Sequence, residues 1–221
     1  KPGLIDDIRP PASSQIYDIN GKLITNIHSE QNRIPVKLSK VPKNLQEAFI
    51  AVEDARFYQH SGIDPRGILR AVWSNITNRG VAEGGSTITQ QLAKNAYLSQ
   101  EQTLKRKIQE VFLALQIERN YTKNEILELY LNQIYFGQGA YGVEAASQVY
   151  FNKNVEDITL AEAAMLAGIP KSPNYYSPLN NLKASQDRKN VVLSQMEKYG
   201  YINASKATEA KNEKINISMK H

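Results

Sequence analysis

The most informative stretch of this chain reads Gly84-Gly85-Ser86-Thr87-Ile88-Thr89-Gln90-Gln91-Leu92-Ala93-Lys94-Asn95. Hydroxyl and amide side chains follow two glycines and lead to a lysine. Such groups suit a polyhydroxylated or phosphorylated ligand, because they supply donors and acceptors while the lysine supplies charge. The alternative is a Gly-Gly hinge before a helix whose first turn is rich in Ser and Thr. The stretch alone leaves both interpretations open, and the rest of the chain must decide.

Composition bounds the protein class. With 221 residues, 41% of them hydrophobic and 22% charged, the chain can form one substantial core or at most two small lobes. The net charge of +5 favours an anionic partner, but no long basic block is present, which argues against nucleic-acid binding. The absence of cysteine excludes disulfides and thiolate metal sites. No apolar run approaches the ~20 residues that span a bilayer, and because the chain opens at Lys1 we expect an excised piece.

The chain divides into an arm and a helical body. Two β-prone runs, residues 14–19 and 22–27, flank Asn20-Gly21 and predict a β-hairpin within an arm of residues 1–40. Residues 41–221 read as one mainly α-helical domain, in which Asn44 is expected to cap the first helix. Three capping boxes start later helices: Ser99 with Gln102, Thr122 with Glu125, and Thr159 with Glu162.

Glu53 is the first candidate for acid–base chemistry. It lies four residues from both Phe49 and Phe57, at the edge of the apolar stripe of the expected helix, whereas Asp54 points away from that stripe. A carboxylate beside aromatic rings loses hydration, which raises its pKa and makes it a useful proton acceptor near neutral pH. The alternative is a solvated residue on the helix flank. For His60, which has no second histidine at metal-binding spacing, we expect a structural hydrogen-bonding role.

Glu110 is the second candidate, on a helix expected over residues 100–119. The apolar residues of this helix share one face that we expect to be buried: Leu104, Ile108, Val111, Phe112 and Leu115. Glu110 lies off that face, with Thr103, Arg106 and Lys107. One interpretation is an exposed ion pair with Arg106, worth well under ~1 kcal/mol. The other is a carboxylate set among cations near a phosphate, where it binds a divalent metal or positions a leaving group.

Five motifs in order resemble those of the family 51 peptidoglycan glycosyltransferases, the glycan-polymerising domains of class A penicillin-binding proteins and of monofunctional enzymes. They are Glu53-Asp54-x-x-Phe57-x-x-His60-x-Gly62-x-Asp64, residues 84–95, Arg106-Lys107-x-x-Glu110, residues 125–139 and residues 160–173. The similarity covers residues 14–212, and the opening hairpin looks more like the class A branch.

The resemblance implies a lysozyme-like, mainly α fold with a head lobe and a smaller jaw lobe that dips into the membrane. The jaw would span about residues 66–98. Apolar residues recur there at helical spacing, flanked by Arg66, Arg70 and Arg79: Ile68, Leu69, Val72, Trp73 and Ile76. This pattern suits an interfacial helix with its apolar side in lipid. The alternative is a core-packing helix with surface arginines.

The reaction implied by the resemblance joins lipid II to a glycan chain carried on undecaprenyl pyrophosphate. Glu53 would be the general base that removes the proton from the acceptor's GlcNAc 4-hydroxyl. That oxygen attacks the anomeric carbon of the donor MurNAc, inverts it and expels the lipid pyrophosphate. Glu110 would assist on the donor side, as a ligand of Mg²⁺. Other matching positions would line the substrate cleft: Arg70, Ser86, Gln90, Gln91, Lys94, Asn95, Arg106 and Lys107. Gln102 departs from the family pattern, where arginine is common.

The family also implies partners and a location. We expect a membrane surface, a transmembrane anchor before the chain, a position at the extracytoplasmic face of a bacterial plasma membrane and a transpeptidase domain after the chain. Two rival functions remain. One is a lysozyme-like lytic enzyme, although such enzymes commonly carry serine after the catalytic glutamate, where this chain has Asp54. The other is a non-catalytic, membrane-peripheral binding module.

Overall fold

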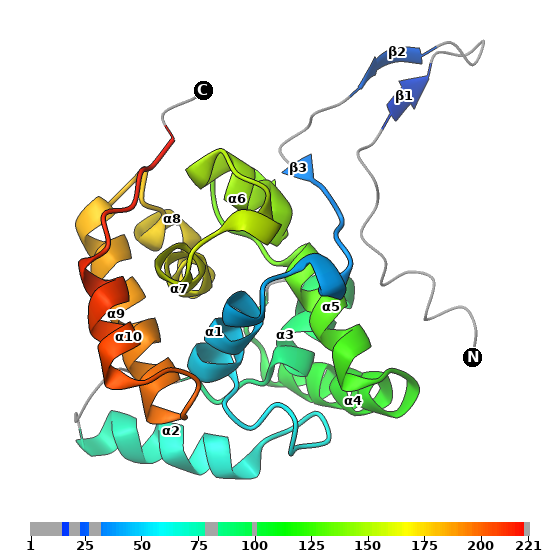
Figure 1. The fold of residues 1–221 in the computed structure, drawn as a ribbon. Helices are drawn as coiled ribbons and strands as arrows, with labels where there is room; N and C mark the ends of the chain where they lie inside the picture. The colour runs from blue at the N-terminus through cyan, green and yellow to red at the C-terminus, as the bar shows by residue number, and fades with distance from the viewer. Residues whose placement is uncertain (1–14, 18–22, 27–31, 78–83, 99–100, 219–221) are drawn as a thin grey trace.

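The computed structural model describes residues 15–17, 23–26, 32–77, 84–98 and 101–218 (Figure 1). Ten α-helices lie within these ranges, which confirms the prediction of a mainly α-helical protein. They are α1 (Lys43–Glu53), α2 (Pro65–Thr77), α3 (Ile88–Tyr97), α4 (Leu104–Asn120), α5 (Lys123–Gln133), α6 (Val143–Phe151), α7 (Leu160–Gly168), α8 (Pro173–Tyr176), α9 (Leu182–Lys198) and α10 (Ala204–Asn212).

Four short strands accompany the helices within the described ranges. β1 (Gln15–Tyr17) pairs antiparallel with β2 (Leu23–Asn26), while the Asn20-Gly21 turn of the expected hairpin lies outside the described residues. β3 (Asn32–Arg33) pairs in parallel with β4 (Ala140–Tyr141). Val36 and the Asn132 side chain then exchange two hydrogen bonds of 2.9 Å. Residues 32–36 are therefore attached to the helical body, and the division of the chain at residue 40 stays a prediction.

Helix α7 lies at the centre of the body, and Figure 1 shows it end-on between α1, α6 and α9. Every residue of α7 after Leu160 is buried, which is typical of a helix packed on all sides. Its small residues let neighbouring helices approach closely. A Cβ added at Gly168 would lie 2.6 Å from Arg188 Cγ. This close packing brings the Arg188 side chain of α9 into the interior.

Of the predicted helix caps, some are found in the structure and others are not. The capping boxes of Thr122 with Glu125 and of Thr159 with Glu162 are confirmed. Ser99 lies outside the described residues, and α4 begins later than expected, at Leu104, where the hydroxyl of Thr103 caps it. The Asn44 prediction is wrong: the cap position is Pro42, two residues earlier, and it provides no side-chain cap. Proline is tolerated at a helix start because its fixed φ suits that position and its missing N–H would have no intrahelical partner there.

The prediction that the apolar face of α4 is buried in the core is wrong. Leu104, Ile108 and Phe112 are 79%, 49% and 69% exposed. The opposite face, with Glu110 and Ala114, is buried where α4 packs against α3 and α5. Periodicity identified an apolar face correctly, but it could not tell which face of the helix meets the rest of the protein.

Helix α2 also presents its apolar face outward, at one edge of the molecule in Figure 1. Trp73 and Ile76 are 70% and 74% exposed, and only Gly67 and Ala71 of this helix are buried. The alternative of a core-packing helix is therefore wrong. No helix in the described part of the chain is long and apolar enough to cross a membrane. A lysozyme-like division into head and jaw lobes stays a prediction.

Candidate active site

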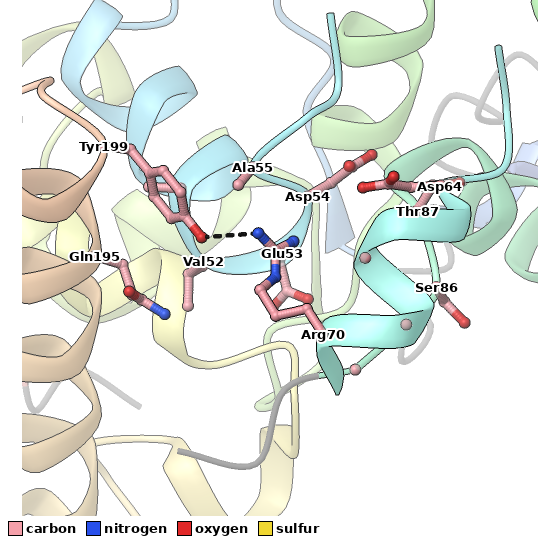
Figure 2. A pocket seen from close by; sticks show the side chains of 14 residues that line it. Val52, Glu53, Asp54, Ala55, Asp64, Arg70, Ser86, Thr87, Gln195 and Tyr199 are labelled. Carbon is pink, nitrogen blue, oxygen red and sulfur yellow. Dashed lines mark hydrogen bonds between the residues drawn. The ribbon is translucent and has the colours of Figure 1, made fainter. Parts of the chain in front are cut away.

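Glu53 is the last residue of α1 and borders a small pocket between α2, residues 84–87 and the end of α9 (Figure 2). Figure 2 shows the Arg70 side chain reaching from α2 toward Tyr199, to which its Nη1 donates a 3.3 Å hydrogen bond. Glu53 Oε2 accepts from Gln91 Nε2 at 3.4 Å. The other oxygen, Oε1, is buried and has no hydrogen-bond partner within the described residues.

Burial raises the pKa of Glu53, as the sequence predicted. The positive charges of Arg188 and Lys171 and the hydrogen bond from Gln91 oppose the rise, while the neighbouring Asp54 adds to it. Sequence reasoning missed both cations. Lys171 lies inside the fifth motif, but nothing in its spacing indicates that it approaches Glu53. No sequence pattern indicated that Arg188 lies near Glu53, because the packing of α9 on α7 brings it there.

Helical periodicity predicted that Asp54 points away from the core, and this prediction is wrong. Asp54 is buried and accepts hydrogen bonds from His60 Nε2 at 2.6 Å and from the backbone N–H of Ile88, the first residue of α3, at 3.0 Å. Because Gly62 N–H donates to His60 Nδ1, the ring proton lies on Nε2. These bonds confirm the structural role of His60. They also fasten the end of α1 to the start of α3, since a carboxylate binds a helix N-terminus favourably.

A larger cavity of about 530 Å³ lies beside this pocket. Lys107 is its central cation: Nζ donates to Glu110 Oε1 at 2.9 Å and to Ser86 Oγ at 2.8 Å. The alternative of an exposed ion pair between Glu110 and Arg106 is wrong, because Glu110 is buried and the Arg106 guanidinium donates to Gln109 at 3.0 Å and lies 3.7 Å from Glu101. The cavity is lined by Ser86, Gln91, Lys94, Leu98, Glu101, Gln102, Thr103, Leu104, Arg106, Lys107 and Glu110.

Ser86 and Gln91 connect the two spaces. Ser86 borders both, and Gln91 lines the larger cavity while it hydrogen-bonds Glu53 in the smaller one. A desolvated carboxylate therefore lies one amide group away from a cavity that holds three cationic side chains. This arrangement can accept a proton on one side and hold an anion on the other.

Two of the expected cleft residues lie elsewhere. Gln90 is buried, and its side chain accepts from Thr87 N–H in a capping box that starts α3. Asn95 is exposed on α3 and lines neither space. The opening stretch is a loop followed by a capped helix, and both a ligand-binding role and a hinge stay predictions. Its first residues form the loop that passes close to α2, where a Cβ added at Gly85 would lie 3.2 Å from Ile68, and its later residues form the helix.

Few acidic side chains line the larger cavity, where the magnesium site was expected. Glu110 and Glu101 are the acidic residues of the larger cavity. No group of three or more His, Cys, Asp or Glu side chains that could hold a metal occurs in the described ranges. Mg²⁺ is commonly bound by one or two carboxylates together with substrate phosphates, so Glu110 fits the part of a single protein ligand.

Comparison with known proteins agrees with this helical fold. A family model described as transglycosylase matches residues 20–197, and the chain belongs to this family. It is a peptidoglycan glycosyltransferase domain, similar to those of class A penicillin-binding proteins.

The similar proteins are much longer than this chain. Penicillin-binding protein 1A of Escherichia coli is 50% identical over 214 residues, which cover 97% of this chain and 25% of that protein. Penicillin-binding protein 1F of Bacillus subtilis is 48% identical over 95% of this chain and 29% of its own length. The crystal structure of penicillin-binding protein 1A from Haemophilus influenzae superposes with a TM-score of 0.52 at 33% identity, covering 92% of this chain and 21% of that one.

Proposed function

We propose that this domain polymerises lipid II by transferring the glycan from its lipid pyrophosphate carrier to the GlcNAc 4-hydroxyl of lipid II. The observation that carries the proposal is the buried Oε1 of Glu53, which has no hydrogen-bond partner in the described part of the chain and lies one amide group away from the cationic cavity. Proton acceptance and anion binding are the two tasks that such a transfer requires. The 530 Å³ cavity has room for a diphosphate and part of a sugar.

Glu53 is the general base. Its Oε1 removes the proton as the acceptor oxygen attacks the anomeric carbon of the donor. The bond from that carbon to the pyrophosphate oxygen breaks, the electron pair leaves with the pyrophosphate, and the new linkage is β-1,4. Burial strengthens the base because it raises the pKa of Glu53, while the positive charges of Arg188 and Lys171 limit the rise.

The cations of the larger cavity hold the leaving group. Lys94, Arg106 and Lys107 can each offset part of the pyrophosphate charge as it increases in the transition state. Glu110 keeps the Lys107 ammonium directed into the cavity. Glu110 also fits as the protein ligand of Mg²⁺, which would supply further positive charge to the pyrophosphate when bound.

The exposed apolar face of α2 suits contact with the membrane that carries the lipid substrates. We expect Trp73→Glu to weaken binding to phosphatidylglycerol vesicles. Leu182→Glu, a matched change at another exposed apolar residue, should leave binding unaltered. Equal losses in both variants would contradict an interfacial role for α2.

Because the chain spans about a quarter of the E. coli relative, we place it within a longer protein. That protein would carry a membrane anchor before this domain and a transpeptidase domain after it, at the extracytoplasmic face of the plasma membrane. The coding sequence on either side of this chain tests the arrangement directly.

The central test uses fluorescent lipid II with detergent and Mg²⁺. We expect long glycan chains that a muramidase degrades, because the product linkage is β-1,4. Shortening of preformed glycan without growth would favour the lytic rival. Lipid II binding without either product would favour the non-catalytic module.

A further inference from the structure

A chain of two hydrogen bonds runs from the core to the proposed base. Tyr130 of α5 donates from Oη to Gln91 Oε1 at 3.1 Å, and Gln91 Nε2 donates to Glu53 Oε2 at 3.4 Å. Resting on the proposed function, we infer that Tyr130 is a positioning residue. Through Gln91 it holds Glu53 by Oε2 and leaves Oε1 to take the proton of the acceptor hydroxyl.

The chemistry of the three groups fixes the direction of the chain. An ionised carboxylate only accepts hydrogen bonds, so Gln91 must turn its amide nitrogen toward Glu53. The amide oxygen then faces Tyr130, whose hydroxyl donates. Because Oε2 is engaged in this way, the buried Oε1, which has no partner among the described residues, is the oxygen left for a substrate.

Packing fixes the tyrosine itself. Tyr130 is almost fully buried, and its ring meets the Phe49 ring edge-on with the centroids 5.8 Å apart. Phe49 lies one turn before Glu53 on α1, so Tyr130 meets this helix directly at Phe49 and, through Gln91 of α3, at Glu53. Burial raises the pKa of Tyr130 well above its ordinary value, so the hydroxyl keeps its proton and remains a donor.

This inference gives Gln91 a second role. The resemblance placed Gln91 among substrate-binding residues, and it does line the cationic cavity. Its amide oxygen and one amide hydrogen are nevertheless engaged inside the protein. Loss of Gln91 should therefore alter the base as well as substrate binding.

Besides Tyr130, several charged groups affect the pKa of Glu53. Removal of the Tyr130 hydroxyl should therefore shift this pKa only in part. Arg188 and Lys171 oppose the rise of its pKa, and Asp54 adds to the rise. Arg70 and Asp64 border the same small pocket. The inferred contribution of Tyr130 is the part that passes through Gln91.

The first test needs no substrate. The Glu53 carboxyl is titrated by NMR in protein labelled with ¹³C-glutamate, and its signal is assigned by its loss in Glu53→Gln. In Tyr130→Phe the Gln91 amide is free to turn away, so the titration midpoint of Glu53 should move to higher pH. An unchanged midpoint would overturn the inference.

Tyr150→Phe is the matched control. Tyr150 is also fully buried, but its hydroxyl donates to the backbone carbonyl of Phe136 at 2.6 Å and lies 2.9 Å from Ser177 Oγ. Its loss should lower the melting temperature without moving the Glu53 midpoint. An equal shift in both variants would mean that any buried tyrosine hydroxyl has this effect, and would also overturn the inference.

The second test uses polymerisation. The acid limb of kcat should move to higher pH in Tyr130→Phe, with kcat about tenfold lower on that limb and KM little changed. Combining Tyr130→Phe with Gln91→Leu should cost no more than Gln91→Leu alone, because Tyr130 acts through Gln91. Fully additive losses would overturn the inference. Wild type that makes no polymer, with the NMR shift present, would refute the proposed function and leave the positioning role standing.

Discussion

Glu53 and Glu110 border the same site from different helices, and their surroundings differ. Glu53 Oε1 is buried without a hydrogen-bond partner among the described residues, and burial raises the pKa of this carboxyl. Glu110 is also buried, but its Oε1 accepts from the Lys107 ammonium at 2.9 Å. A carboxylate with an unpartnered oxygen suits proton transfer, whereas one bound to a cation suits the organisation of a phosphate site. Burial alone therefore does not define the role of a carboxylate; its partners do.

The largest expected effect tests the base. Glu53→Gln keeps the shape and the hydrogen-bonding capacity of the side chain but cannot take a proton. We expect at least ~10³-fold slower glycan polymerisation, within the range for loss of a general base, with lipid II binding retained. Glu47→Gln is the matched control on α1, since Glu47 also has a pKa raised by burial. Equal polymer from Glu53→Gln and wild type would remove Glu53 from the mechanism.

A smaller loss is expected on the donor side. Glu110→Gln leaves the Lys107 ammonium without the carboxylate that directs it into the cavity, and we expect ~10²-fold slower polymerisation. The loss should depend on the Mg²⁺ concentration if Glu110 is a metal ligand. A titration of rate against Mg²⁺ in both proteins measures this. A rate indifferent to the substitution would reduce Glu110 to a structural partner of Lys107.

Removal of one cation should weaken donor binding about tenfold. Lys107→Gln deletes the ammonium that contacts both Ser86 and Glu110, and a hydrogen bond to a charged group is worth about this much. The measurement is KM for the donor, the glycan linked to lipid pyrophosphate. Lys105→Gln is the control, because Lys105 is exposed on the same helix and lines neither space. Similar KM changes in both variants would indicate only a general charge effect.

The smallest expected effect concerns stability. The pKa of Glu53 is raised in the folded state, so folding becomes less favourable as pH rises above 4.5, the ordinary value of a glutamate. Glu53→Gln removes this cost, and we expect a higher melting temperature than wild type at pH 7 but no difference at pH 3. Glu110→Gln should show no such gain, because it leaves Lys107 without its carboxylate partner. Thermal unfolding at both pH values separates the two glutamates.

Local signals in the sequence predicted much of the fold. Capping boxes marked the starts of α5 and α7, and the spacing of Phe49 and Phe57 predicted the desolvation of Glu53. Each of these signals operates within about one helical turn, so it can be read without knowing the tertiary structure. The predictions for α4 and Asp54 failed because helical periodicity defines faces but not what covers them.

The sequence by itself determined that the protein is mainly helical, which family it belongs to and which carboxylates are candidates. Only the tertiary structure decided how those carboxylates are partnered. Gln91 and Tyr130 lie 38 and 39 residues from the groups they contact. Arg188 reaches the surroundings of Glu53 only because a glycine in α7 lets α9 approach closely. Such contacts depend on the packing of whole helices, and no local pattern of residues encodes them.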